Sequence, residues 1–170
     1  MQVRPLSDTD LDSFIELRLQ GLKESPDSFL ISYEQEKETG PSYFQELLGT
    51  ENPDNIIFGF FMDDKLLGIL GMFRDNLPKL SHRMNIWGLY VHPDVRRNGV
   101  AKALMKKSID HAKKQERIFN IRLSVDSKNK KAIELYQKFG FVEWGVEPKA
   151  TQGINELLDD VHMSLNLGES

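Results

Sequence analysis

The chain has 170 residues, of which 39% are hydrophobic and 28% charged, a balance that is typical of a folded domain and not of a disordered segment. Its formal net charge of −4 argues against general nucleic-acid binding, so any phosphate should be recognised by local geometry. The lack of cysteine excludes disulfides, thiolate metal ligands and a cysteine nucleophile, and the four histidines show no metal-ligand spacing.

The amino terminus has no apolar run behind its charged residues, which argues against a signal peptide. No apolar segment approaches the roughly 20 residues that a membrane-spanning helix needs. No repeat and no Pro/Gly/Ser-rich linker divides the chain. We therefore expect a single domain over residues 1–170, located in the cytoplasm, that binds no membrane, no nucleic acid and no metal.

The first 50 residues predict one short strand followed by helices. Residues 2–6 form the strand, and Ser7 or Asp8 can cap a helix with a regular apolar face. Residues 25–50 then predict a loop and two short helices, separated by a turn at Gly40.

The middle of the chain predicts three strands. Two apolar runs, NIIFGFFM at 55–62 and LLGILGMF at 66–73, flank a short acidic turn and predict a hairpin of buried strands. HRMNIWGLYV at 82–91 predicts the third strand. Gly88 within it indicates a bulge or a close backbone approach.

From Gly99 onward the apolar period changes from about 2 to about 3.6 residues, which predicts an amphipathic helix. NIRLSV at 120–125 predicts another strand, and NKKAIELYQKFGF at 129–141 predicts a second amphipathic helix that Gly140 ends. The tail predicts two closing strands around a polar loop. This order of elements predicts an α/β protein with a mixed sheet and helices on both faces.

The turn before the first amphipathic helix predicts an anion site. A helix start presents amide N–H groups without partners and a partial positive charge, and a glycine there lets a ligand approach the backbone. A solvent-exposed basic turn without a ligand would have the same local sequence. This turn, however, follows a buried strand, and α/β folds bind ligands at the ends of such strands. Neither the Walker pattern nor the dinucleotide glycine pattern fits. The residues of the predicted phosphate site are Arg96, Arg97, Asn98, Gly99, Val100 and Ala101.

Two motifs in this part of the chain resemble those of the GCN5-related N-acetyltransferases. The first is Gln/Arg-x-x-Gly-x-Gly/Ala after a Val-x-Pro element, and Arg96, Gly99 and Ala101 fill its specified positions. The second is Asn-x-x-Ala-x-x-Leu-Tyr-x-x-x-Gly-Phe, which the sequence matches at Asn129, Ala132, Leu135, Tyr136, Gly140 and Phe141. The resemblance is close from Met84 to Phe141 and extends loosely to the whole chain.

The resemblance implies a mostly antiparallel sheet of six to seven strands that splays near a cofactor site. It implies that acetyl-CoA is the acyl donor, with its pyrophosphate on the backbone amides from Arg97 to Ala101. Pantetheine would pair like an added strand with Leu89, Tyr90 and Val91. Asn129 would contact pantetheine or order its loop, although an asparagine that only caps a turn would look the same.

For the chemistry, the resemblance implies that Tyr136 supports the leaving thiolate, although a tyrosine on an apolar helix stripe also suits the core. A backbone amide at Val91 or a neighbour would polarise the acyl carbonyl. Many relatives carry a catalytic glutamate on the strand that corresponds to Met84–Val91, and this sequence has none. The remaining candidates for a base, all weak, are His82, Asp126 and Glu34.

The acceptor is expected to be a primary amine of a small molecule, peptide or protein, held by the segments 25–50 and 147–154. Aromatic residues that could line its pocket are Tyr33, Trp87, Tyr90 and Trp144, although aromatic side chains on strands usually pack in a core. Two other functions stay open, a non-catalytic acyl-CoA-binding module and an acyltransferase for another acyl-CoA. The sequence does not decide between a monomer and a homodimer.

Overall fold

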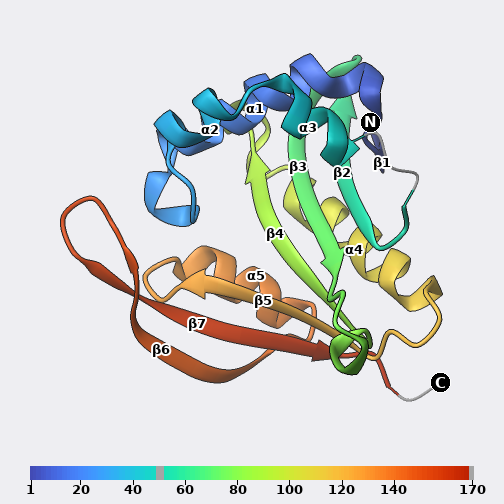
Figure 1. The fold of residues 1–170 in the computed structure, drawn as a ribbon, viewed down its shortest axis with the longest axis vertical. Coiled ribbons are helices and arrows are strands. Elements are labelled where there is room, and N and C mark those ends of the chain that lie inside the picture. The colour runs from blue at the N-terminus through green and yellow to red at the C-terminus, as the bar shows by residue number, and fades with distance from the viewer. Residues whose placement is uncertain (49–51, 169–170) are drawn as a thin grey trace.

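The computed structural model describes residues 1–48 and 52–168, so the last two residues of the predicted segment 25–50 lie outside the described residues. The predicted order of strands and helices is confirmed (Figure 1). The elements are β1 (Gln2–Pro5), α1 (Leu11–Glu24), α2 (Tyr33–Thr39), α3 (Pro41–Leu48), β2 (Asn55–Met62), β3 (Lys65–Arg74), β4 (Arg83–Val91), α4 (Val100–Lys114), β5 (Asn120–Asp126), α5 (Lys130–Lys138), β6 (Val142–Gln152) and β7 (Leu157–Asn166).

Local sequence sets the entry to α1. Ser7 caps a 3-10 turn that leads into the helix, and its amide N–H donates to Asp10 Oδ2 at 2.9 Å. Arg4 on β1 donates two hydrogen bonds of 2.7 Å to the same carboxylate. Because the Arg4 guanidinium stabilises the ionised form, the pKa of Asp10 lies below its usual range. These contacts fix the path from β1 onto the helical layer.

Residues with positive φ make the tight turns. Gly40 has φ of 82° between α2 and α3, a conformation that glycine adopts without a steric penalty. The hairpin of β2 and β3 turns at Asp63 and Asp64, which have φ of 49° and 60°. Two successive positive values are characteristic of the two-residue turns that match strand twist, and aspartate tolerates them.

The seven strands form one sheet in the order β1-β2-β3-β4-β5-β7-β6. All neighbouring strands are antiparallel except β4 and β5, which run parallel. This pair is joined at only three positions, Arg83 with Asn120, Met84 with Ile121 and Asn85 with Arg122. Beyond these positions the strands diverge and leave a gap, here called the split, between a β1–β4 arm and a β5-β7-β6 arm (Figure 1).

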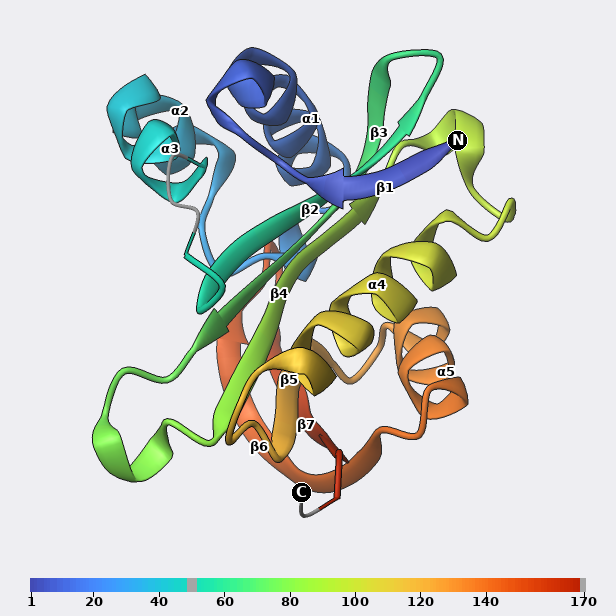
Figure 2. The same cartoon turned by 90° about the vertical axis from the view of Figure 1, so that its right-hand side faces the viewer.

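Helices cover both faces of the sheet, as the sequence predicts. The helices α1, α2 and α3 lie on one side and α4 and α5 on the other (Figure 2). Leu104 and Met105 of α4 are fully buried against the strands, and each contributes roughly 2 kcal/mol of hydrophobic stabilisation. Phe14 of α1 and Phe44 of α3 anchor the other face. No helix among the described residues has the length and apolar character that a membrane span requires.

The predicted irregularity at Gly88 is a bulge. Ile69 and Gly71 on β3 pair with Tyr90 and Trp87 on β4, so β4 holds one extra residue between the two pairs. Gly88 has φ of 64°, and a Cβ there would lie 3.0 Å from Arg18 Nη1. Both readings of this glycine, a bulge and a close approach, are therefore confirmed. The bulge bends β4 where the split opens.

Candidate active site

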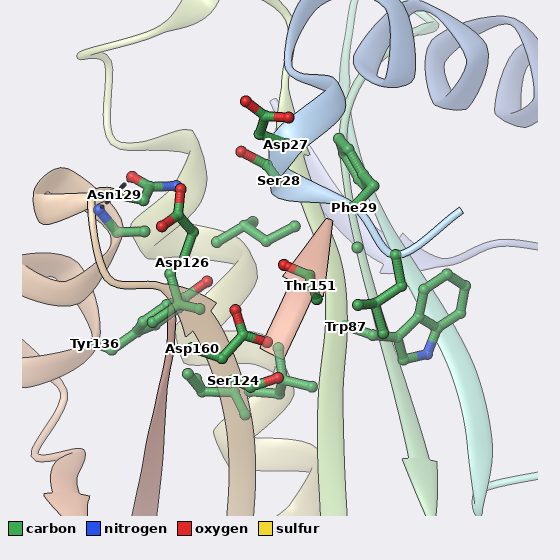
Figure 3. Close-up of a pocket in the computed structure, with 17 residues that line it drawn as sticks. Asp27, Ser28, Phe29, Trp87, Ser124, Asp126, Asn129, Tyr136, Thr151 and Asp160 are labelled. Atoms are coloured by element: carbon green, nitrogen blue, oxygen red, sulfur yellow. Dashed lines mark hydrogen bonds between the residues drawn. The ribbon is translucent and has the colours of Figure 1, made fainter. Parts of the chain in front are cut away.

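A cavity of about 140 Å³ fills the split beside the carboxyl ends of β4 and β5 (Figure 3). Its walls come from four parts of the chain that are far apart in sequence. The residues that line it are Asp27, Ser28, Phe29, Leu30, Ile86, Trp87, Gly88, Leu89, Leu123, Ser124, Val125, Asp126, Asn129, Ala132, Tyr136, Thr151 and Asp160. We call it the Tyr136 cavity.

Tyr136 reaches this cavity from the buried face of α5. Only 7% of the residue is exposed, and its ring packs 6.0 Å from the ring of Phe141, so it is a core residue as well as a wall of the cavity. Burial disfavours the charged phenolate and raises the pKa of Tyr136 to about 12. The hydroxyl therefore stays protonated and can act as a hydrogen-bond donor at every physiological pH.

Three carboxylates, Asp27, Asp126 and Asp160, line the cavity, and its described lining contains no lysine or arginine. Asp27 Oδ1 accepts the Ile154 amide N–H at 3.0 Å. Asp126 Oδ1 accepts the Lys128 amide N–H at 3.0 Å, which shapes the turn between β5 and α5. These carboxylates make the cavity attractive to a cation.

Asn129 caps α5 at the rim of the cavity. Its side-chain oxygen accepts the Ala132 amide N–H at 3.2 Å, a contact drawn in Figure 3. The structure therefore shows the capping contact that the sequence also allowed. A contact between Asn129 and a cofactor stays a prediction.

Among the described residues, the edge of β4 that borders the split has no strand partner after Asn85. The His92 amide donates to the Leu67 carbonyl of β3 at 2.8 Å, so the backbone groups of Tyr90 also face β3. Val91 consequently turns its N–H and C=O groups toward the split, and Leu89, next to the bulge, borders the Tyr136 cavity. Tyr90 thus differs from the prediction, because its peptide groups belong to the β3–β4 ladder and cannot pair with an added strand.

The amides at the start of α4 lie where the sequence predicts an anion site, and anion binding there stays a prediction. Arg97 and Gly99 have φ of 65° and 80°, and nothing lies within 4 Å of a Cβ built on Gly99. The first helical hydrogen bond runs from the Ala103 amide to the Gly99 carbonyl at 2.9 Å. Within the described residues, the amides from Arg97 to Lys102 therefore have no backbone acceptor. They border a cavity of about 410 Å³ between α4 and α5.

The side chain of Arg96 holds the turn together, and its contact with a phosphate stays a prediction. Its Nε donates to the Val91 carbonyl at 2.9 Å, and its Nη1 lies 2.5 Å from Glu24 Oε1 at the end of α1. The Tyr90 hydroxyl donates to Glu24 Oε2 at 2.5 Å. The hydrogen bonds from Arg96 and Tyr90 lower the pKa of Glu24 below its usual range, and burial together with the Glu24 carboxylate raises the pKa of Tyr90.

A second cavity, of about 770 Å³, opens on the α1–α3 side of the sheet. It shares Phe29, Trp87 and Ser124 with the Tyr136 cavity, so the two lie side by side. Tyr43, Leu47 and Phe73 line its outer part. The two cavities together are lined by residues from the segments 25–50 and 147–154, in which the sequence placed acceptor contacts.

A buried ion pair forms part of the wall of the second cavity. Arg18 Nε donates to Glu36 Oε1 at 2.7 Å, and both residues are at least nine-tenths buried. The guanidinium lies 4.9 Å from the ring of Phe29 and 5.4 Å from that of Trp87. This pair joins α1 to α2 and positions two aromatic residues at the cavity wall.

Several residues that the sequence nominated lie elsewhere. His82 and Glu34 line neither of the two cavities, whereas Asp126 lines the Tyr136 cavity. Of the four nominated aromatic residues only Trp87 lines them. Sequence reasoning missed Asp160, because it is distant from both motifs and nothing local distinguishes it from the neighbouring Asp159.

Comparison with known proteins identifies the fold and the family. Residues 19–141 match the model of the acetyltransferase (GNAT) family, which covers the split, the Gly99 turn and Tyr136. The acetyltransferase yncA from Salmonella typhimurium, solved with its cofactor acetyl-CoA, superimposes with a TM-score of 0.85 at 16% identity, over 100% of this chain and 95% of that one. At this identity the likeness shows the fold alone.

Two relatives are similar in sequence. An uncharacterised N-acetyltransferase from Methanocaldococcus jannaschii is 30% identical over 146 residues, which are 83% of this chain and 60% of the relative. The L-amino acid N-acetyltransferase AaaT from Escherichia coli is 30% identical over 103 residues, which are 61% of this chain and 63% of the relative. The chain therefore spans less than two thirds of the length of either protein. The family match, with the split sheet and both motifs in place, shows that the chain belongs to the acetyltransferase (GNAT) family.

Proposed function

We propose that the protein is an N-acetyltransferase that moves the acetyl group of acetyl-CoA directly to a primary amine. One observation carries this proposal. The split places Tyr136 in a cavity that adjoins a second cavity on one face of the sheet, while the amides at the Gly99 turn, which have no backbone acceptor among the described residues, lie on the other face. Donor and acceptor can therefore meet at Tyr136 from opposite sides. The proposal treats residues 1–170 as one acetyltransferase domain.

The residues at the split fit acetyl-CoA. The amides from Arg97 to Lys102 provide donors for the pyrophosphate, and the absence of a side chain at Gly99 lets it approach. The backbone groups of Leu89 and the Val91 amide can pair with pantetheine. The Val91 carbonyl is less available, because it accepts a hydrogen bond from Arg96. The cavity of about 140 Å³ supports a short acyl group.

Leu89 is the best-placed donor to the acyl carbonyl. It lines the Tyr136 cavity, whereas Val91 lines the cavity beside the Gly99 turn. On this proposal the Leu89 amide, next to the bulge at Gly88, donates into the split and stabilises negative charge that develops on the acyl oxygen. The sequence expectation of Val91 or a neighbour is thereby narrowed to Leu89.

Tyr136 would stabilise the leaving thiolate by a hydrogen bond. The pKa of Tyr136 is about 12 and that of a thiol is about 8.5, so complete proton transfer would run uphill by roughly 5 kcal/mol. A hydrogen bond from the neutral hydroxyl does not require this free energy of proton transfer. It stabilises the transition state, in which negative charge grows on sulfur. The proton on the thiol product comes instead from the amine nitrogen, which must lose it.

A cationic amine is the acceptor class that the cavities favour. The carboxylates of Asp27, Asp126 and Asp160 line the reaction cavity without a lysine or arginine among its described residues. The similar protein from Escherichia coli bears the name of an L-amino acid N-acetyltransferase, which also acts on a primary amine. The identity of the acceptor within this class follows from a screen.

Calorimetry with acetyl-CoA, followed by release of the coenzyme A thiol with a panel of primary amines, tests the proposal. We expect binding of acetyl-CoA and thiol release with at least one alkyl amine. Binding without release for every amine would favour a non-catalytic acyl-CoA-binding module. Faster release from succinyl-CoA or a longer acyl-CoA than from acetyl-CoA would assign another acyl donor.

A further inference from the structure

Asp160 is the one carboxylate of the Tyr136 cavity to which the described residues give no structural role. Asp27 and Asp126 each accept a backbone N–H through Oδ1. No hydrogen bond from the described part of the protein reaches the carboxylate of Asp160. It lines the cavity near Ser124 and Thr151 (Figure 3). A half-buried carboxylate without a partner in a reaction cavity is available for chemistry.

The strand register places Asp160 on the acceptor side of the split. Asp160 on β7 is paired with Asp126 on β5, and paired residues project to the same face of a sheet. The alternate residue Val161 is buried in the core under α4 and α5, so Asp160 faces away from these helices. Ser124, on the same face, lines both cavities. Tyr136 reaches the cavity from α5, and Asp160 from the opposite face.

An alkyl amine cannot attack a thioester until it loses a proton. At neutral pH about 99% or more of such an amine is the ammonium form, which has no free electron pair. A base beside the acceptor is therefore required, and Tyr136 cannot serve because its hydroxyl stays protonated.

The groups around Asp160 suit a base. Burial raises the pKa of Asp160 above its usual range, and the carboxylates of Asp126 on β5 and Glu147 on β6 raise it further, while His162 on β7 opposes them. Asp27 and Tyr136 complete the titratable groups of the cavity among the described residues. A carboxylate whose pKa moves toward neutrality is a better proton acceptor than an ordinary aspartate.

We propose that Asp160 is the general base that deprotonates the acceptor ammonium, an inference that rests on the proposed function. The Asp160 carboxylate takes one proton from the ammonium and later releases it to water. The free amine nitrogen forms a bond to the acyl carbon, and the bond from that carbon to sulfur breaks. The second proton of the nitrogen passes to the thiolate, which Tyr136 holds by a hydrogen bond, and the products are an amide and coenzyme A.

Two amines of nearly equal shape test the role of Asp160. Ethylamine is almost entirely ammonium at neutral pH, whereas trifluoroethylamine is mostly free amine because its fluorines withdraw electrons. We expect Asp160→Asn to slow acetylation of ethylamine by about a hundredfold or more and that of trifluoroethylamine by less than about threefold. Thiol release from acetyl-CoA measures both rates.

The pH dependence gives a second readout that a structural role would not move. In the wild type, kcat/KM for ethylamine should be level between the pKa of Asp160 and that of the amine, because ammonium and carboxylate are both present throughout. In Asp160→Asn the rate should instead rise about tenfold per pH unit, in proportion to the free amine. The same slope in both proteins would overturn the proposal.

Asp159→Asn is the matched control, since it changes the adjacent residue of the same strand, which lines neither cavity. The new amide oxygen can still accept the Lys149 amide N–H that Asp159 Oδ1 accepts at 2.7 Å. Equal losses with both amines in Asp160→Asn, or no loss with either, would refute the base assignment. A wild type that binds acetyl-CoA but releases thiol with no amine of the panel would refute the proposed transfer itself.

Discussion

The two sides of the split contribute different kinds of groups. The β4 side and the Gly99 turn offer backbone amides and carbonyls, whose positions are set by the bulge at Gly88 and by positive φ angles. The side formed by β5, β7 and α5 offers side chains, namely Tyr136 and the carboxylates of Asp126 and Asp160. On our proposal the first side binds the donor and polarises its acyl carbonyl, and the second supplies the side chains for proton transfer and for the leaving thiolate. Affinity for the donor and the rate of transfer should therefore respond to different substitutions.

Removal of the Tyr136 hydroxyl should separate the two sides most clearly. We expect Tyr136→Phe to lower kcat about a hundredfold, because a donor to the leaving thiolate is lost. The affinity for coenzyme A, measured by calorimetry, should change little. Tyr33→Phe on α2 is the matched control, because it removes a hydroxyl from a residue that lines neither cavity. Full turnover by Tyr136→Phe would contradict the assignment of Tyr136 as the hydrogen-bond donor to the leaving thiolate.

The Gly99 turn should show the opposite pattern. Alanine at φ of 80° costs about 1–2 kcal/mol, and its methyl group would stand where the pyrophosphate is proposed to bind. We therefore expect Gly99→Ala to weaken coenzyme A binding about tenfold or more. Gly40→Ala carries the same backbone cost at φ of 82°, far from the split, and should lower only the free energy of unfolding. Equal affinity in the two variants would contradict the proposed phosphate site.

Loss of the contact between Glu24 and Arg96 should weaken coenzyme A binding less than the change at Gly99 does. Glu24→Ala removes the acceptor for Tyr90 and Arg96, so the turn that holds the amides loses one support. Because these groups are partly exposed, we expect coenzyme A affinity to fall only about threefold, or roughly 0.7 kcal/mol. Glu16→Ala on the exposed face of α1 should leave the affinity unchanged. If calorimetry finds the same coenzyme A affinity in Glu24→Ala and the wild type, the contact between Glu24 and Arg96 does not support the binding site.

The smallest effect concerns stability on the chemical side. The folded state raises the pKa of Asp160, so the fold disfavours the ionised carboxylate. A raised carboxyl pKa lowers stability as pH increases through the interval between the unfolded and folded values, and the penalty persists at neutral pH. Asp160→Asn should therefore leave Tm at neutral pH unchanged or slightly higher. A marked fall in Tm would indicate a structural role.

Sequence reasoning predicted the backbone side of the split well. Positive φ and close approach demand particular residues at particular positions, so Gly88 and Gly99 are visible without a structure. The element order was also predictable, since the change of apolar period at Gly99 separates strands from helices.

The chemical side was less predictable because distant strands assemble it. Asp160 meets Asp126 only through the register of β7 on β5, and local sequence does not encode that register. The sequence shows the charge of Arg96 but not its partners, because Glu24 and the Val91 carbonyl lie on other elements. The motif identifies Tyr136 as a functional residue. Its burial agrees with the core position that the apolar stripe of its helix also predicts.

The three-position pairing of β4 and β5 has a kinetic consequence. The cavity beside the Gly99 turn and the second cavity lie on opposite faces of the sheet, so the two proposed substrates would have separate entrances and neither would have to leave before the other arrives. Double-reciprocal plots at several fixed acceptor concentrations should then intersect, in the manner of a ternary complex. Parallel lines would indicate a covalent acyl-enzyme and would contradict simultaneous binding of the two substrates.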